Sequence, residues 1–126
     1  MKLLVVDDEQ DVKFLFEQHF RKEIRSNGME FMFAFSGEQA LHYLDEHSHD
    51  AVLILSDINM PGMSGLQLLQ RIKETYEAPI PQIMMMTAYG DDENYSLAMK
   101  YGADDFLTKP IDFTALKDKL KSVANS

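Results

Sequence analysis

Short apolar runs alternate with longer amphipathic stretches along the whole chain. The runs that we interpret as strands are Lys2–Val6, Glu30–Phe35, Ala51–Ser56, Gln82–Met86 and Asp105–Thr108. After each run, apolar residues recur every three or four positions, which is typical of a helix that packs one face on a core. Short apolar runs separated by helices indicate parallel strands buried on both faces. The pattern predicts a β-α unit repeated five times.

Polar residues and glycines mark where the predicted helices begin and end. The first helix is expected to be long, from about Glu9 to Ser26, and to end at Asn27-Gly28. Gly28 is expected to supply the left-handed conformation that ends many helices. Ser36 followed by Gln39 predicts a capping box at the second helix. The remaining helices are expected to begin at Ser64, Asp91 and Asp112.

Five β-α units joined by right-handed crossovers leave few sheet topologies. We expect a flavodoxin-like (βα)5 doubly wound sandwich, with a five-stranded parallel sheet of order 2-1-3-4-5. With 126 residues, the chain is the size of one domain, which we place over residues 1–126.

Composition and charge exclude several classes of function. The chain has no cysteine, so disulfides and thiol catalysis are excluded, which is consistent with a reducing cytosol. The longest purely apolar run is five residues, Ala51 to Leu55, too short for a membrane span or a signal-peptide core. A formal net charge of −9 argues against direct binding to nucleic acid, whose phosphates would repel the chain.

Ionisable and polar side chains stand where four of the predicted strands end. Asp7 and Asp8 follow the first strand, Asp57 the third, Thr87 the fourth and Lys109 the fifth. The carboxyl ends of parallel strands share one edge of the sheet, where open α/β sheets bind their ligands. We therefore expect three carboxylates, a hydroxyl and an ammonium group to meet in one crevice.

Three clustered carboxylates need either protons or a cation to offset their mutual repulsion. Two such charges about 5 Å apart repel by roughly 3 kcal/mol at an effective dielectric constant near 20. An oxygen-only ligand set favours a hard ion, so the sequence predicts Mg²⁺, with Mn²⁺ and Ca²⁺ as alternatives. Mg²⁺ commonly joins carboxylates to a phosphate oxygen. Asp57 is then the expected nucleophile of a phosphoryl transfer, with Lys109 and Thr87 contacting the phosphoryl oxygens.

The order of five short motifs carries a family resemblance. These are Val5-Val6-Asp7-Asp8-Glu9, Ser56-Asp57-Ile58-Asn59-Met60-Pro61-Gly62-Met63-Ser64-Gly65, Met86-Thr87-Ala88, Gly102-Ala103-Asp104-Asp105-Phe106 and Leu107-Thr108-Lys109-Pro110. In this order and spacing, the chain resembles the receiver domain of bacterial two-component response regulators over essentially its full length.

The resemblance implies a phosphoryl acceptor and a metal site. Asp57 would take the group from the phosphohistidine of a sensor histidine kinase or a phosphotransfer protein. Asp8 and Asp57 would ligate Mg²⁺ directly, together with the backbone carbonyl of Asn59, and Asp7 would act through water. Such a domain dephosphorylates itself slowly and is not an enzyme that turns over small molecules.

The resemblance also implies a switch. Thr87 and Lys109 would hold the phosphoryl group, with a cis peptide expected at Lys109-Pro110. Phe106 occupies an aromatic switch position but lacks the hydroxyl of a tyrosine, so its two states would differ through packing alone. Asn59 and Tyr89 stand at positions that tune self-hydrolysis in the family.

A face made by the fourth helix, the fifth strand and the fifth helix would read out phosphorylation. Its partners would be a downstream effector domain or protein, and a phosphorylation-dependent homodimer is a second outcome. The resemblance implies a bacterial, cytoplasmic protein with no membrane contact.

Two other functions stay open at this point. A Mg²⁺-dependent phosphohydrolase with an aspartyl-phosphate intermediate usually needs a second acid, whereas position 59 is Asn59 and no cap domain is present. A nucleotide- or flavin-binding module would need a glycine-rich phosphate loop, and the sequence contains none.

Methionines and histidines are expected to be structural. We assign Met84-Met85-Met86 to the core, since methionine fills irregular gaps. His42, His47 and His49 are expected to be solvated rather than zinc ligands. His19 is expected to pack at the edge of the core.

Overall fold

The computed structural model describes residues 1–47, 53–77, 80–88 and 90–124 of the chain. The sheet contains five parallel strands, which are β1 (Lys2–Val6), β2 (Glu30–Ala34), β3 (Leu53–Asp57), β4 (Gln82–Ala88) and β5 (Asp105–Lys109). Their order, β2-β1-β3-β4-β5, confirms the predicted doubly wound topology. Ala51 and Val52, the first two residues of the predicted third strand, lie outside the described residues.

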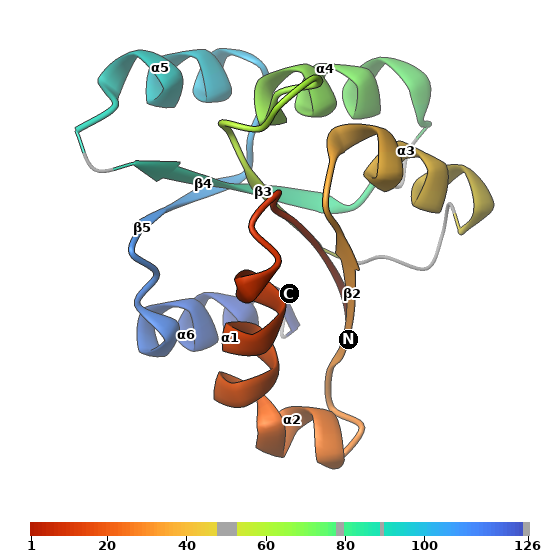
Figure 1. Ribbon diagram of the computed structural model, residues 1–126, viewed down its shortest axis with the longest axis vertical. Coiled ribbons are helices and arrows are strands. Elements are labelled where there is room, and N and C mark those ends of the chain that lie inside the picture. Colours follow the sequence, from red (N-terminus) through yellow and green to blue (C-terminus); the bar gives the residue numbers. More distant parts are fainter. Residues whose placement is uncertain (48–52, 78–79, 89, 125–126) are drawn as a thin grey trace.

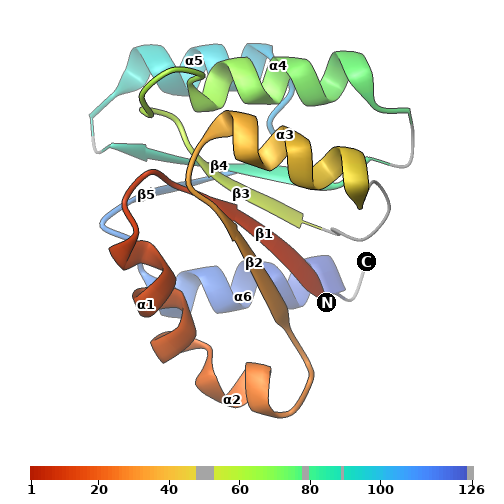
Figure 2. The ribbon, with the colours of Figure 1, turned by 45° about the vertical axis from the view of Figure 1, so that its right-hand side comes forward.

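Helices cover both faces of the sheet, as Figures 1 and 2 show. The six helices are α1 (Asp11–His19), α2 (Arg21–Arg25), α3 (Gly37–Glu46), α4 (Gly65–Thr75), α5 (Asp92–Lys100) and α6 (Phe113–Ala124). One layer holds α3, α4 and α5, and the opposite layer holds α1, α2 and α6. None of the helices in the described residues combines the length and the apolarity that crossing a membrane requires.

The strands contribute alternate side chains to two apolar cores. Leu4, Ile54 and Met85 belong to the core beneath α3, α4 and α5, whereas Leu55 and Met86 belong to the core beneath α1 and α6. Side chains of a strand point alternately to opposite faces, so a buried parallel strand must be apolar on both. Met84, Met85 and Met86 are all buried, which confirms their predicted place in the core.

The predicted long first helix is wrong in one respect, because the structure breaks it at Phe20. Phe20 leaves helical geometry, with φ −108° and ψ 22°, and separates α1 from α2. Its ring is fully buried and stacks on Phe16, and the bend lets Ile24 pack against the same core. Asn27, not Gly28, takes the left-handed conformation at the end of α2, with φ 60°.

The predicted caps are found, with one exchange of partners. The Ser36 hydroxyl accepts the N–H of Gln39, but the Gln39 side chain accepts from Phe35 and so does not complete the expected box. A complete capping box forms instead at the start of α4, between Ser64 and Gln67. Asp91 caps α5, and the Asp112 carboxylate accepts two N–H groups in the first turn of α6. Each predicted helix start is therefore confirmed.

Candidate functional site

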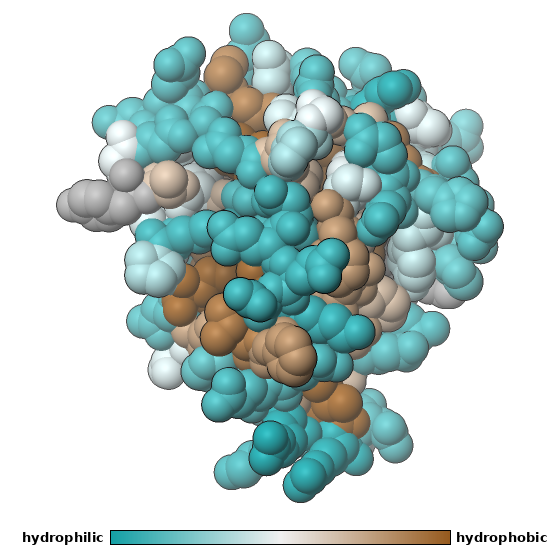
Figure 3. Space-filling model, viewed as in Figure 1, coloured by the Kyte–Doolittle hydropathy of each residue, from teal (hydrophilic) through white to brown (hydrophobic). Residues whose placement is uncertain are grey.

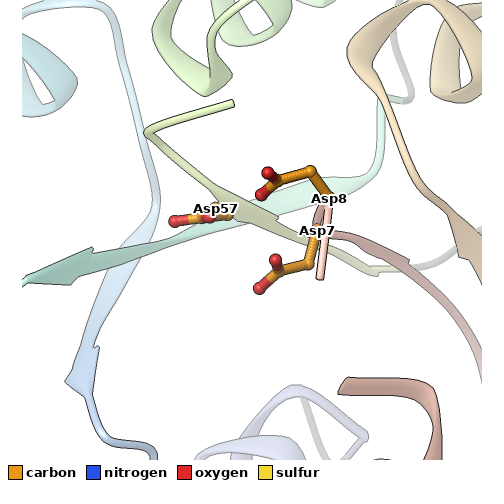
Figure 4. Close-up of side chains that lie close together, drawn as sticks. All are labelled: Asp7, Asp8 and Asp57. Carbon is orange, nitrogen blue, oxygen red and sulfur yellow. The ribbon is translucent and has the colours of Figure 1, made fainter. Parts of the chain in front are cut away.

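Three carboxylates converge beyond the carboxyl ends of β1 and β3. Asp7, Asp8 and Asp57 each place an oxygen within 4.8 Å of the other two. Figure 4 shows the three side chains projecting in the same direction from the ends of these neighbouring strands. Asp7 and Asp57 are buried, with 2% and 7% of each residue exposed, whereas Asp8 is exposed to solvent. The structure thus brings together the acidic residues that the sequence singled out.

Backbone hydrogen bonds fix the positions of the two buried acids. The N–H of Asp7 donates to the carbonyl of Ala34, which extends the pairing of β1 with β2 by one residue. The Asp7 carboxylate in turn accepts the N–H of Glu9 at 3.0 Å. The hydroxyl of buried Ser56 donates to the carbonyl of Asp57 at 3.0 Å. Both carboxylates are therefore presented from ordered strand ends.

Lys109 joins the two buried carboxylates. Its Nζ lies 2.9 Å from Oδ2 of Asp7 and 3.2 Å from Oδ2 of Asp57. The sequence predicted that this ammonium group and the three carboxylates would meet in one crevice, but not that Asp7 would be its closer partner. Lys109 precedes Pro110 through the expected cis peptide bond.

The unpredicted pairing follows from the alternation of side chains along the strands. Val5, Leu55 and Leu107 all point into the core beneath α1 and α6. Asp7, Asp57 and Lys109 stand two residues after them, so they face the same side of the sheet. Hydrophobic patterning alone contained this signal.

Burial and neighbouring charges shift the pKa values of two of these groups. Burial first, and then the charge of Asp7, raises the pKa of Asp57 above its ordinary value, while Lys109 opposes the rise. Burial lowers the pKa of Lys109, but the hydrogen bond to Asp7 and the charge of Asp57 outweigh it, so that this pKa is raised. When all three acids are ionised, three negative charges and one ammonium leave two negative charges.

That charge and the donor set fit a hard divalent cation. Every candidate ligand atom in the cluster is a carboxylate oxygen, which Mg²⁺ and Ca²⁺ prefer. Within the described residues, no other group of three or more acidic or histidine side chains comes together in this way. Asn59, the predicted carbonyl ligand, lies in the loop after β3, and its side chain is exposed.

Thr87 lies on β4, the strand next to β3, and Phe106 lies on β5, the following strand in the sheet. Thr87 is buried, and its hydroxyl donates to the carbonyl of Leu107 at 3.5 Å. The half-buried ring of Phe106 packs against the core and lies 4.4 Å from the ring of Tyr95, between centroids. Tyr89, the predicted tuning residue, lies outside the described residues.

Gly65, which sequence reasoning missed, allows the tight turn that follows β3. Its N–H donates to the carbonyl of Ile58 at 2.7 Å, which closes the loop of residues 58–64. A Cβ at this position would lie 2.0 Å from the carbonyl oxygen of Asp57. The sequence signal was a glycine at the first position of a helix, where stronger helix formers were available.

The predicted histidine roles are confirmed only in part. The ring of His19 stacks on Phe113 at 3.9 Å, but the residue remains exposed rather than packed into the core. His42 and His47 are exposed, and His42 lies 3.2 Å from Glu46. His49 lies outside the described residues.

Comparisons with known proteins agree with this geometry. The family model for the response regulator receiver domain matches residues 3–121. A response regulator receiver domain protein from Clostridium thermocellum is 29% identical with a TM-score of 0.84, covering 98% of this chain and 94% of that one. The receiver domain of NtrX from Brucella abortus is 29% identical with a TM-score of 0.81, covering 98% of each chain. The Vibrio cholerae chemotaxis protein CheY4 is 27% identical with a TM-score of 0.77, covering 97% of each chain.

A match over nearly the whole chain, together with the sheet order and the acidic cluster at the strand ends, assigns the family. The chain belongs to the response regulator receiver domains of two-component systems.

Proposed function

We propose that this receiver domain is a phospho-accepting switch in which Asp57 takes a phosphoryl group from a histidine kinase or a phosphotransfer protein in a Mg²⁺-dependent reaction. One observation carries the proposal: Asp57 is a buried carboxylate that lies within reach of Asp7, Asp8 and Lys109. Receiver domains link the input of a histidine kinase to the output of an effector.

The transfer step uses the residues present. An oxygen of the Asp57 carboxylate attacks the phosphorus of a phosphohistidine, the P–N bond breaks, and the imidazole leaves with the electron pair. Lys109 is placed to exchange its contact with Asp57 for one with a phosphoryl oxygen, and Thr87 offers a second donor. A bound Mg²⁺ would supply positive charge beside the oxygens of the transferred group.

The hydrogen bonds suggest how the acids divide the metal site. Both carboxylate oxygens of Asp7 already accept hydrogen bonds, from Glu9 and from Lys109. Asp8 is exposed, and Asp57 uses Oδ2 for Lys109. We assign direct contacts with the cation to Asp8, Asp57 and the backbone carbonyl of Asn59, and a contact through water to Asp7.

An apolar groove lies beside the acceptor site. It has a volume of about 590 Å³, and its lining includes Leu15 of α1, Ile111 and, at the acceptor end, Asp7 and Lys109. Phe14 and Leu15 expose 75% and 46% of their surface, and Figure 3 shows hydrophobic surface over α1. A phosphodonor protein that docks here would bring its phosphohistidine close to Asp57.

The proposed output face consists of α5, β5 and α6. These are the fourth helix, fifth strand and fifth helix expected from the sequence, because the predicted first helix is divided into α1 and α2. Entry of Thr87 toward a phosphoryl group would favour an inward position of the Phe106 ring, which now contacts Tyr95. Tyr95 and Met99 of α5 expose 43% and 56% of their surface, so this face has apolar groups to offer. An effector, or a second phosphorylated copy in the cytoplasm, would bind there.

Labelling with acetyl phosphate tests the proposed acceptor. In Mg²⁺, intact-mass measurement should show one phosphoryl group per chain, whereas Asp57→Asn, which keeps the size of the side chain, should take up none. Undiminished labelling of Asp57→Asn would contradict the proposal. A phosphohydrolase would instead release many phosphates per chain from a phosphomonoester, and we expect no such turnover.

A further inference from the structure

We infer that Glu38, at the start of α3, is a positioning residue that holds the loop following the acceptor in place through a hydrogen bond to the Met63 backbone. The inference rests on the proposed function, since the loop of residues 58–64 carries Asn59 beside Asp57. Glu38 and Met63 are 25 residues apart, and the Oε1 atom of Glu38 accepts the Met63 N–H at 3.1 Å. The bond thus joins α3 to the loop that follows Asp57, the proposed acceptor.

The rest of the loop shows why this bond matters. The base of the loop is closed by the following helix, through the bond from the N–H of Gly65, the first residue of α4, to the carbonyl of Ile58. The N–H of Ser64 is taken by the Gln67 side chain within α4. Among the described residues, the bond to Glu38 is the one hydrogen bond that ties residues 58–64 to an element other than β3 and α4, which flank the loop. Buried Ile58 and Met60 anchor the loop from below, but Asn59 is exposed between them.

The first turn of α3 is shaped to receive the loop. Gly37 has no side chain where the Met63 side chain packs, and a Cβ there would lie 2.8 Å from the Met63 sulfur. Gly62 takes a left-handed conformation, with φ 73°, and its missing side chain would point toward Glu38 Oε1 at 3.3 Å. Two glycines therefore allow α3 and the loop to approach closely.

The carboxylate suits its place as an acceptor. Hydrogen bonds from the N–H groups of Glu38 itself and of Met63 lower the pKa of Glu38 below its ordinary value. The group is thus ionised at neutral pH, and a charge-assisted bond is stronger than a neutral one. An acid in the first turn also suits the helix dipole, so stabilisation of α3 alone is the alternative explanation to be tested.

The expected consequence of this bond is tighter binding of Mg²⁺ at the proposed metal site. A loop that is ordered before the cation binds loses less conformational entropy on binding. Removing the acceptor by Glu38→Ala should free the Met63 N–H and weaken Mg²⁺ binding by roughly three- to tenfold, the effect of one lost hydrogen bond. Glu38→Gln retains a side-chain oxygen acceptor and should restore most of the affinity.

Three variants test the inference. Glu38→Ala, Glu38→Gln and Ser36→Ala are compared by hydrogen exchange of the Met63 amide and by Mg²⁺ titration. Ser36→Ala removes the cap of α3, together with the hydroxyl that also contacts the Glu38 carboxylate, but it keeps the Glu38 acceptor of the Met63 N–H. It therefore controls for loss of helix stability. We expect faster Met63 exchange and weaker Mg²⁺ binding in Glu38→Ala, near-normal values in Glu38→Gln, and only lower thermal stability in Ser36→Ala.

The outcomes separate this inference from the proposed function. Normal Met63 exchange or normal Mg²⁺ affinity in Glu38→Ala would overturn the positioning role, and so would equal effects of Ser36→Ala. Absence of Mg²⁺ binding by the unaltered chain would instead overturn the proposed function. In that case Met63 exchange in Glu38→Ala would still decide whether the tether exists.

Discussion

Asp57 carries its charge in an unfavourable environment. Its side chain is mostly removed from water, and the like charge of Asp7 lies close by, so Lys109 is its main compensation. Such an arrangement disfavours the ionised acid until more positive charge arrives. The same features that make the ionised form of Asp57 unfavourable would, under the proposed function, favour binding of a cation and a phosphoryl group there.

A first prediction concerns pH. Because the pKa of Asp57 is raised in the folded state above its ordinary value of 3.8, the folded state holds this proton more tightly than the unfolded state does. This group's contribution to stability is therefore favourable at low pH and is lost as pH rises through the raised pKa. Asp57→Asn should gain stability relative to the unaltered chain between pH 4 and pH 7, measured by urea unfolding. A difference that is independent of pH would contradict this.

A second prediction concerns Lys109. Lys109→Ala leaves two buried carboxylates without their cation, so unfolding free energy should fall by about 1–3 kcal/mol, discounted for the partial exposure of the lysine. Mg²⁺ binding should remain, while the response to phosphorylation should weaken. The matched control is Lys119→Ala, whose pair with Asp105 has the same 2.9 Å length, but whose carboxylate is 37% exposed, against 2% for Asp7.

Urea denaturation of both lysine variants gives the comparison. The control should lose less than about 1 kcal/mol, as is usual for exposed pairs. Equal losses of unfolding free energy in the two variants would contradict the prediction that the buried carboxylates depend on the charge of Lys109.

At the scale of elements, the turn from β3 into α4 sets the geometry of the site. β3 ends at Asp57, and α4 begins at Gly65, whose backbone lies close to the backbone of Asp57. The capping box of Ser64 and Gln67 then fixes where α4 starts. The contact between Gly65 and the end of β3 thus sets the positions of α4 and of the loop of residues 58–64.

A third prediction follows from this close approach. Gly65→Ala would place a methyl group 2.0 Å from a backbone oxygen, and neither can move without displacing β3. We expect a loss of about 2–4 kcal/mol in unfolding free energy, with impaired phosphorylation. Gly28→Ala is the control, because its new methyl would meet no atom closer than 3.5 Å. Thermal melting of both variants distinguishes them, and a stable, fully active Gly65→Ala would refute the assignment.

The positions of helices and strands were largely predictable from the sequence, but the bend in the first helix was not. Strand positions and helix starts depend on local pattern and capping chemistry, so β1, Ser64 and Asp112 were found where expected. The break at Phe20 depends on how its ring packs in the assembled core, which no local pattern contains. Local sequence determines where elements begin more reliably than how they bend.

At the scale of the whole molecule, the proposed docking groove, acceptor site and output face share one sheet. The groove beside α1 includes Asp7 and Lys109 in its lining, and Lys109 ends β5, a strand of the proposed output face. Strand order and the ends of the apolar runs were enough to predict that Asp7, Asp57 and Lys109 would meet. The pairing of Lys109 with Asp7 also required the alternation of faces. The closeness of Gly65 to Asp57 required coordinates.

Mapping the phosphorylated residue decides whether Asp57 is the phosphoryl acceptor. After reaction with acetyl phosphate and Mg²⁺, borohydride reduction converts the acyl phosphate to an alcohol, and peptide mass spectrometry locates it. We expect reduction at Asp57 alone, and none when the cation is removed by a chelator. Reduction at Asp7 or Asp8, or equal labelling without a divalent cation, would contradict this expectation.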